Sequence, residues 1–97
     1  MPGYILAKVN VTDAKKFQEY LIANPETVAK YGGKYIVRGG EKETLEGAPV
    51  DKRVVIIKFP SYDKAKKWYH STDYQNVRKI RSDAADVSII VINGVEK

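Results

Sequence analysis

Arg38 and Arg81 are the two side chains of this sequence with the clearest capacity for chemistry. Arg38 stands directly before a pair of glycines, where the backbone can bend and a ligand can approach closely. Arg81 falls on the same side of a predicted helix as Tyr74. If both guanidinium groups point between helices and sheet, they form a fork suited to a carboxylate or an enolate. In the alternative, one or both form structural salt bridges, for instance with Asp63 or Asp83.

Aromatic side chains could form the walls of a pocket around these arginines. A tyrosine suits that place because its phenol has an apolar face and a hydrogen-bonding tip. A Trp-Tyr stripe at helical spacing more commonly packs in a core, and we favour the core for Trp68. For Tyr74, beside a helix start, pocket lining and core packing both remain open. The aromatic candidates are Tyr20, Tyr35, Trp68, Tyr69 and Tyr74, of which Tyr35, Trp68 and Tyr74 are the proposed ligand-binding residues.

His70 is the only histidine and the one candidate for a general base. An imidazole has a pKa near neutrality, which suits proton transfer. The alternative is that His70 ends a helix, where a partly cationic ring interacts well with the helix dipole. No second histidine and no obvious carboxylate partner accompany it, so we favour the helix-ending role. One histidine, scattered carboxylates and no cysteine provide no metal-ligand spacing, and we expect neither a metal nor another cofactor.

The charge of the chain suggests acidic partners, but its distribution argues against nucleic acid. The 17 Lys and Arg residues outnumber the 12 Asp and Glu residues, for a net charge of +5. The positive residues are interleaved with apolar positions along predicted helices, as on a solvated surface. An RNA-recognition sheet also needs outward-facing aromatic residues, whereas the apolar run 54–57 occupies the third strand. We therefore do not expect nucleic-acid binding.

The spacing of apolar residues predicts the elements that would position these side chains. Apolar residues alternate in the strands and recur every three or four residues in the helices. The order strand, helix, strand, strand, helix, strand is the ferredoxin-like plan. It predicts one α+β domain over residues 1–97, with an antiparallel sheet and the helices on one face. The predicted strands are 4–11, 34–38, 53–59 and 87–92, and the helical stretches are 14–31 (with a second start at Asn24-Pro25), 62–70 and 72–84.

The predicted second strand ends in a region that the sequence describes less sharply. By alternation, Tyr35 and Val37 fall on one side of this strand and Arg38 on the other. The glycine pair 39–40 indicates a bulge or a bend, and residues 41–45 could continue the strand.

Two of the predicted strands are apolar on both faces. In the third strand, Val55 and Ile57 alternate with Val54 and Ile56, and the last strand repeats the pattern over 87–92. Helices on one face cover only one of these surfaces. The simplest cover for the other is the same sheet of a second copy, so we predict a homodimer paired through the sheet face.

Motifs spread over nearly the whole chain form a recognisable pattern: Gly3-Tyr4, Tyr35, Arg38-Gly39-Gly40, Phe59-Pro60-Ser61, Trp68-Tyr69, the run 71–74, Arg81 and Val91-Ile92-Asn93-Gly94. In these residues the chain resembles the domain-of-unknown-function family 1330, within the dimeric α/β-barrel superfamily. The resemblance implies a ferredoxin-like protomer paired sheet to sheet, and no particular reaction. Superfamily relatives include cofactor-free monooxygenases, lactone isomerases, haem-handling enzymes and proteins without known catalysis. Haem-using relatives need an axial ligand, usually a histidine, and the position of His70 disfavours haem.

Together these observations favour a homodimeric small-molecule-binding protein. It could be a cofactor-independent enzyme acting on a small organic acid or an enolisable substrate, with Arg38 and Arg81 orienting the anion. The alternative is a non-catalytic homodimeric interaction or sensor module. The start of the sequence does not look like a signal peptide, and no apolar run approaches the roughly 18–20 residues of a membrane span. We therefore expect a cytoplasmic protein without a membrane partner.

Overall fold

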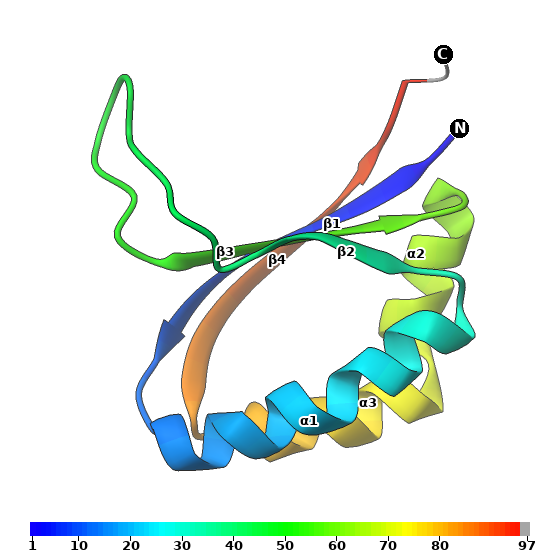
Figure 1. Cartoon of the computed structure of the whole chain (residues 1–97). Helices are drawn as coiled ribbons and strands as arrows, with labels where there is room; N and C mark the ends of the chain where they lie inside the picture. Colours follow the sequence, from blue (N-terminus) through cyan, green and yellow to red (C-terminus); the bar gives the residue numbers. More distant parts are fainter. Residues whose placement is uncertain (96–97) are drawn as a thin grey trace.

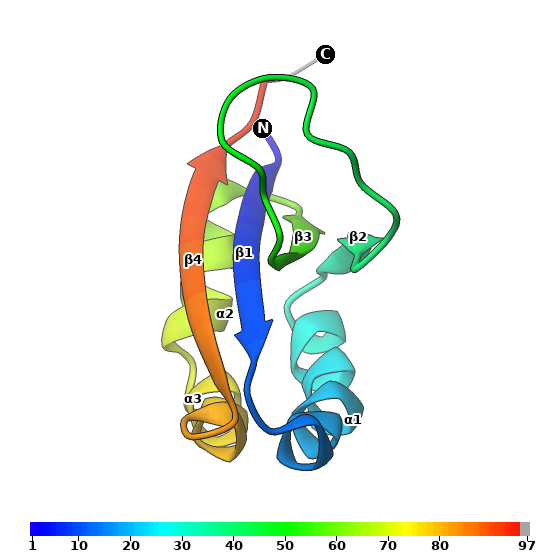
Figure 2. The same ribbon diagram turned by 90° about the vertical axis from the view of Figure 1, so that its left-hand side faces the viewer.

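A four-stranded antiparallel sheet with helices on one face forms the protein, as the computed structural model shows for residues 1–95. The sheet order is β2-β3-β1-β4, and both views place the helices on the same side of it (Figures 1 and 2). This confirms the predicted ferredoxin-like α+β fold. The elements are β1 (Gly3–Val11), α1 (Ala14–Lys30), β2 (Lys34–Arg38), β3 (Arg53–Phe59), α2 (Tyr62–His70), α3 (Thr72–Arg78), the 3-10 turn η1 (Lys79–Arg81) and β4 (Ala85–Asn93).

Side-chain caps determine where the helices begin. Ser61 accepts a hydrogen bond from the Lys64 amide at 3.1 Å, and Ser71 accepts one from the Tyr74 amide at 3.0 Å. Each cap satisfies an amide that has no partner inside its helix. Asp13 caps α1 in the same way.

The helix α1 runs unbroken through Pro25, so the predicted second start at Asn24-Pro25 is wrong. A proline inside a helix removes one amide donor, and the carbonyl four residues earlier loses its partner. Here that carbonyl belongs to Leu21. It is the acceptor of a hydrogen bond from Arg38, which lies outside the helix.

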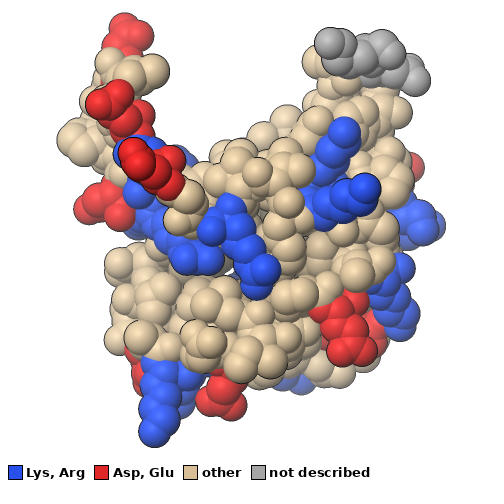
Figure 3. Space-filling view, in the orientation of Figure 1, with Lys and Arg blue, Asp and Glu red and all other residues tan. Residues whose placement is uncertain are grey.

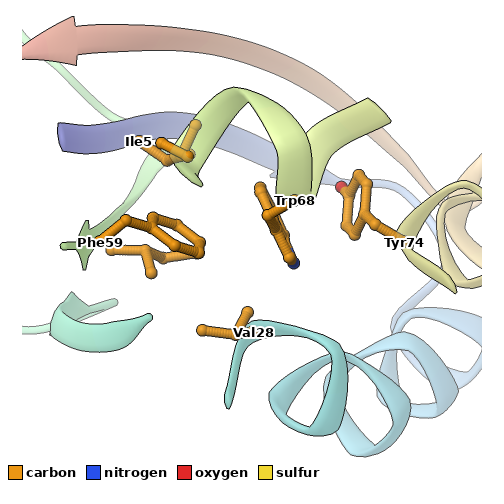
Figure 4. Close-up of a cluster of buried hydrophobic side chains, with 7 residues drawn as sticks. Ile5, Val28, Phe59, Trp68 and Tyr74 are labelled. Carbon is orange, nitrogen blue, oxygen red and sulfur yellow. The ribbon is translucent and has the colours of Figure 1, made fainter. Parts of the chain in front are cut away.

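The core lies between the helices and the inner face of the sheet (Figure 4). Trp68 is central to it: its ring centroid lies 4.2 Å from that of Tyr74 and 5.4 Å from that of Phe59. Its indole Nε1 donates to Thr27 Oγ1 at 3.1 Å, which satisfies the one polar group of the ring. Burial of a large apolar side chain contributes roughly 1.5–3 kcal/mol. Trp68 is therefore structural, as the sequence favoured.

The other face of the sheet is also apolar, and no helix within residues 1–95 covers it. The register aligns Val37, Ile56, Leu6 and Ile90 in one row across all four strands. Ile90 is 50% exposed and Val37 37% exposed. We call this surface the outer face. The predicted pattern of two apolar faces is therefore present in the folded protomer.

A β-bulge in β2 changes which side chains face the helices. Tyr35 pairs with Ile57 and Val37 pairs with Ile56, so Ile36 is an extra residue. The alternation predicted for this strand is consequently wrong: Tyr35 and Arg38 share the inner face, and Val37 lies on the outer face. The bulge lies earlier than the glycine pair, and at the pair itself the chain bends at Gly39, which is the other outcome that the sequence indicated.

Residues 39–52 form no strand, so the possible continuation over 41–45 does not occur. They form a long arm that rises on the side of the sheet away from the helices (Figures 1 and 2).

None of the helices within residues 1–95 is long and apolar enough to cross a membrane.

Candidate functional site

A small cavity lies between α1 and the inner face of the sheet. It has a volume of about 40 Å³, enough for a few water molecules, and the cleft together with its open mouth contains about 500 Å³ of space between atoms. Figure 3 shows Lys and Arg side chains gathered around a hollow at this level. The polar lining consists of Tyr20, Asn24, Tyr35, Arg38, Arg53 and Arg81, and the apolar lining comes chiefly from β1, β3 and β4.

Arg38 reaches this cavity because of the bulge in β2. Its guanidinium carbon lies 4.4 Å from the centroid of the Tyr35 ring, and its Nη2 donates to the Leu21 carbonyl at 3.4 Å. Tyr35 is held in turn by Asn24, whose Nδ2 donates to the phenol oxygen at 3.0 Å. Burial raises the pKa of Tyr35, so this phenol stays protonated. Arg38 itself is exposed, so its positive charge lies at the mouth of the cavity.

Arg81 is deeper in the cavity, only 7% exposed, and is held by two tyrosines. Its Nη2 donates to the Tyr74 hydroxyl at 3.0 Å, and that hydroxyl lies 3.0 Å from the hydroxyl of Tyr20. Burial and the neighbouring Tyr74 raise the pKa of Tyr20 far above its usual value. Burial lowers the pKa of Arg81, but its interactions with the two phenols outweigh that effect and leave the pKa above its usual value. The cluster therefore places the positive charge of Arg81 close to the neutral phenol of Tyr20.

Arg53 is a third cavity arginine, which sequence reasoning missed. A signal was present, because alternation along β3 places Arg53 on the same side as Val55 and Ile57. Gly39 makes room for it: a Cβ atom there would lie 2.5 Å from Arg53 Nη1. Gly39 also has φ +69°, in the region that favours glycine.

The charge on the cavity wall is entirely positive. No Asp or Glu lines it, and the ion pairs of residues 1–95 join Lys16 to Asp83 and Lys30 to Asp73. Within residues 1–95, neither Arg38 nor Arg81 therefore forms a salt bridge of the kind that the sequence suggested. Within the same residues, Arg53 Nε and Arg81 Nε are buried and have no hydrogen-bond acceptor. Such a wall attracts anions, because buried charged donors are costly without a partner.

The predicted site residues fall into three groups in the structure, of which the third is His70 in a groove outside the cavity. Tyr35, Arg38, Trp68 and Arg81 line the cavity, whereas Tyr74 lies behind Arg81 and is fully buried.

His70 is not part of this cavity. It lies at the end of α2 in a separate groove, together with Lys66, Tyr69 and residues of β1 and β4. Its ring packs edge-on against Tyr69, at 5.3 Å between centroids. Within residues 1–95, no three His, Cys, Asp or Glu side chains converge as metal ligands.

The family of the chain follows from a match over nearly its whole length. Residues 2–95 match the model of the family described as domain of unknown function DUF1330. The chain belongs to this family. No curated protein sequence matches it.

Solved structures similar to this DUF1330 protein share its fold at low sequence identity. A protein of unknown function from Rhodopseudomonas palustris is 22% identical, with a TM-score of 0.73 over 99% of this chain and 84% of that one. SnoaB, a cofactor-independent oxygenase from Streptomyces nogalater, is 8% identical, with a TM-score of 0.71 over 99% and 95%. A dimeric ferredoxin-like protein of unknown function from Thermobifida fusca is 12% identical, with a TM-score of 0.63 over 96% and 91%. At these identities the likeness shows the fold alone.

Proposed function

We propose that this protein binds a small organic acid in the cavity between α1 and the sheet, and that it acts as a homodimer. The observation that carries the proposal is the cavity wall itself, where three arginines lie without a lining carboxylate. A carboxylate would supply the missing negative charge and accept paired hydrogen bonds from a guanidinium group.

The shape of the cavity favours a short, partly apolar acid. The enclosed space is small, so a ligand longer than a few atoms must displace the Arg38 side chain from the mouth. That displacement is inexpensive, because Arg38 is exposed and its bond to Leu21 is long, at 3.4 Å. Apolar residues of β1 and β3 would then contact the carbon skeleton of the acid.

The Arg81 cluster favours an enolisable acid as the substrate of an enzyme. Arg81 donates to Tyr74, and Tyr74 can in turn donate to Tyr20, which lines the cavity. When Tyr74 is the donor in its bond with Tyr20, the Tyr20 hydroxyl can donate its own proton to a ligand oxygen in the cavity. Fixed donors of this kind stabilise an enolate more than the neutral ketone. SnoaB, with the same fold, is described as a cofactor-independent oxygenase, which is compatible with such chemistry.

The alternative is a non-catalytic homodimeric interaction or sensor module. The absence of histidine, aspartate and glutamate from the lining of the cavity favours it, because no side chain of ordinary basicity is in place to remove a proton. In this case the same arginines would bind the acid as a signal and leave it unchanged. His70 belongs to neither version, because it lies in the separate groove.

The homodimer is supported by the outer face. Its row of apolar residues, from Val37 to Ile90, has no helix over it in residues 1–95. Another copy of the same surface would cover it symmetrically. The Thermobifida fusca protein of similar fold is described as dimeric, which agrees with this arrangement.

Binding of matched probes tests the proposal. We expect calorimetry to detect benzoate, and to detect benzamide, its neutral counterpart, at least about tenfold more weakly. Arg53→Gln should weaken benzoate binding by a similar factor. Arg78→Gln, which changes an exposed arginine of α3, is the control and should leave the affinity for benzoate unchanged. Equal affinities for benzoate and benzamide, or equal effects of the two substitutions, would exclude the acid site.

Enolisation is tested separately with acetoacetate in deuterated water. Proton NMR would measure deuterium exchange at the carbon between its two carbonyl groups. Exchange that the protein accelerates, and that Tyr20→Phe slows, supports the enzyme. Binding without acceleration supports the sensor module.

A further inference from the structure

The arm, residues 39–52, has features of an interaction segment. It joins β2 to β3 with 14 residues and has no regular structure. Every residue of it is exposed, and Leu45 is 86% exposed. Loops of this length in a compact domain are uncommon and are usually functional. Together with Lys8 and Val54 of the outer face, the arm borders an open groove.

The arm is acidic, whereas the remainder of the chain is strongly basic. It contains four carboxylates, Glu41, Glu43, Glu46 and Asp51, against two lysines. Its net charge is therefore −2, in a chain whose net charge is +5. The rest of the chain thus has a net charge of +7. A basic surface is the natural partner for such a segment.

Lys34 and Lys58 provide a basic surface of this kind on the outer face. They lie directly opposite each other on β2 and β3, and both are exposed. Like charges in this position destabilise a sheet. Neither lysine takes part in the ion pairs found in residues 1–95. The pair therefore lacks a negative partner within the described protomer.

The arm and the lysine pair lie at opposite ends of the same face. The arm leaves β2 after Arg38 and enters β3 at Arg53, whereas Lys34 begins β2 and Lys58 nearly ends β3. Figure 3 shows acidic side chains along the arm at the left and basic side chains at the right of the upper surface. In the described protomer the arm points away from the sheet, and no ion pair joins it to either lysine.

We propose that the arm of one copy docks against Lys34 and Lys58 of a second copy. A two-fold axis that reverses the strand direction between the two sheets places each arm over the lysine pair of the other protomer. Stacked sheets lie about 10 Å apart, and an out-and-back segment of this length reaches at most about 23 Å, so the arm can span the gap. Leu45 then packs on the apolar outer face of the second copy. The inference rests on the proposed homodimer and adds its orientation and its charged contacts.

A charge-exchange experiment tests the contact. The arm variant combines Glu43→Lys and Glu46→Lys, and the sheet variant combines Lys34→Glu and Lys58→Glu. At low salt, each variant should raise the dissociation constant of the dimer at least about tenfold. The protein with all four changes should have a dissociation constant within about threefold of the original value. Analytical ultracentrifugation measures the dissociation constants, and circular dichroism checks that each variant is folded.

Glu19→Lys with Glu26→Lys is the matched control, because it makes the same charge change on the exposed surface of α1. A dimer that the arm variant weakens no more than this control overturns the docking and leaves the homodimer standing. The docking is also overturned if the protein with all four changes does not regain its dimer affinity. If the unchanged protein is a monomer at all concentrations, both the docking and the proposed homodimer are wrong.

Discussion

Pro25 and Arg38 are joined through a single carbonyl group. Pro25 has no amide hydrogen, so the carbonyl of Leu21, one helical turn earlier, receives no bond from it. Arg38 donates to that carbonyl across the mouth of the cavity at 3.4 Å. An unfavourable residue inside α1 thus creates the acceptor that orients a cavity arginine.

Pro25→Ala should stabilise the protein and release Arg38. Alanine restores the helical hydrogen bond and has the higher helix propensity, so we expect the free energy of unfolding to rise by about 1–3 kcal/mol. The restored amide competes with Arg38 for the Leu21 carbonyl, so displacing Arg38 from the mouth should cost less and benzoate binding should strengthen. Urea unfolding and calorimetry measure the two effects. Pro60→Ala, outside any helix, is the control. Unchanged affinity would show that the carbonyl has no part in orienting Arg38.

Gly39→Ala should disturb the cavity, whereas Gly40→Ala should not. At Gly39 the backbone has φ +69°, and a Cβ would lie 2.5 Å from the Arg53 guanidinium group. We expect a loss of about 1–2 kcal/mol of stability and weaker binding of benzoate. At Gly40 no atom lies within 4 Å of an added Cβ, which makes it a matched control. Equal thermal and binding behaviour of the two variants would contradict the role given to Gly39.

The Tyr20–Tyr74 pair should make the protein less stable at alkaline pH. Burial raises the pKa of Tyr20 in the folded state above the unfolded value of 10.0. The unfolded chain then loses this proton first, so the free energy of unfolding falls as the pH rises above about 10. Tyr20→Phe should reduce that slope. Urea unfolding between pH 8 and 11 measures it, and an unchanged slope would place the alkaline loss elsewhere, for instance at Tyr35, whose pKa is also raised.

Ile56→Asp should separate the proposed dimer. Ile56 lies between Val37 and Leu6 in the apolar row of the outer face. A carboxylate there would be buried without a partner in a sheet-to-sheet dimer, at a cost of several kcal/mol. Ultracentrifugation should then find monomers. Ile22→Asp changes a 72% exposed residue of α1 and should leave the association unchanged. Equal behaviour of the two variants would remove the outer face from the interface.

Much of the fold was predictable because its signals are local. Alternating and helical spacings identified the strands and helices, and Ser61 and Ser71 cap helices that begin at residues 62 and 72, as the spacing predicted. The predicted second helix start at Asn24-Pro25 was wrong because tertiary packing outweighs the local effect of the proline. The proline costs a hydrogen bond locally, and packing of α1 on the sheet through Phe17 and Val28 keeps the helix continuous.

The sequence by itself determined the ferredoxin-like plan, the two apolar faces and the choice of Arg38 and Arg81 as notable residues. Only the tertiary structure decided that these two arginines share a cavity. The reason is the single extra residue Ile36, because a shift of one position moves every later side chain of a strand to the opposite face. The structure likewise added Arg53 and moved His70 to a separate groove. Periodicity describes each element on its own, whereas the bulge and the cavity arise from pairing between residues far apart in the chain.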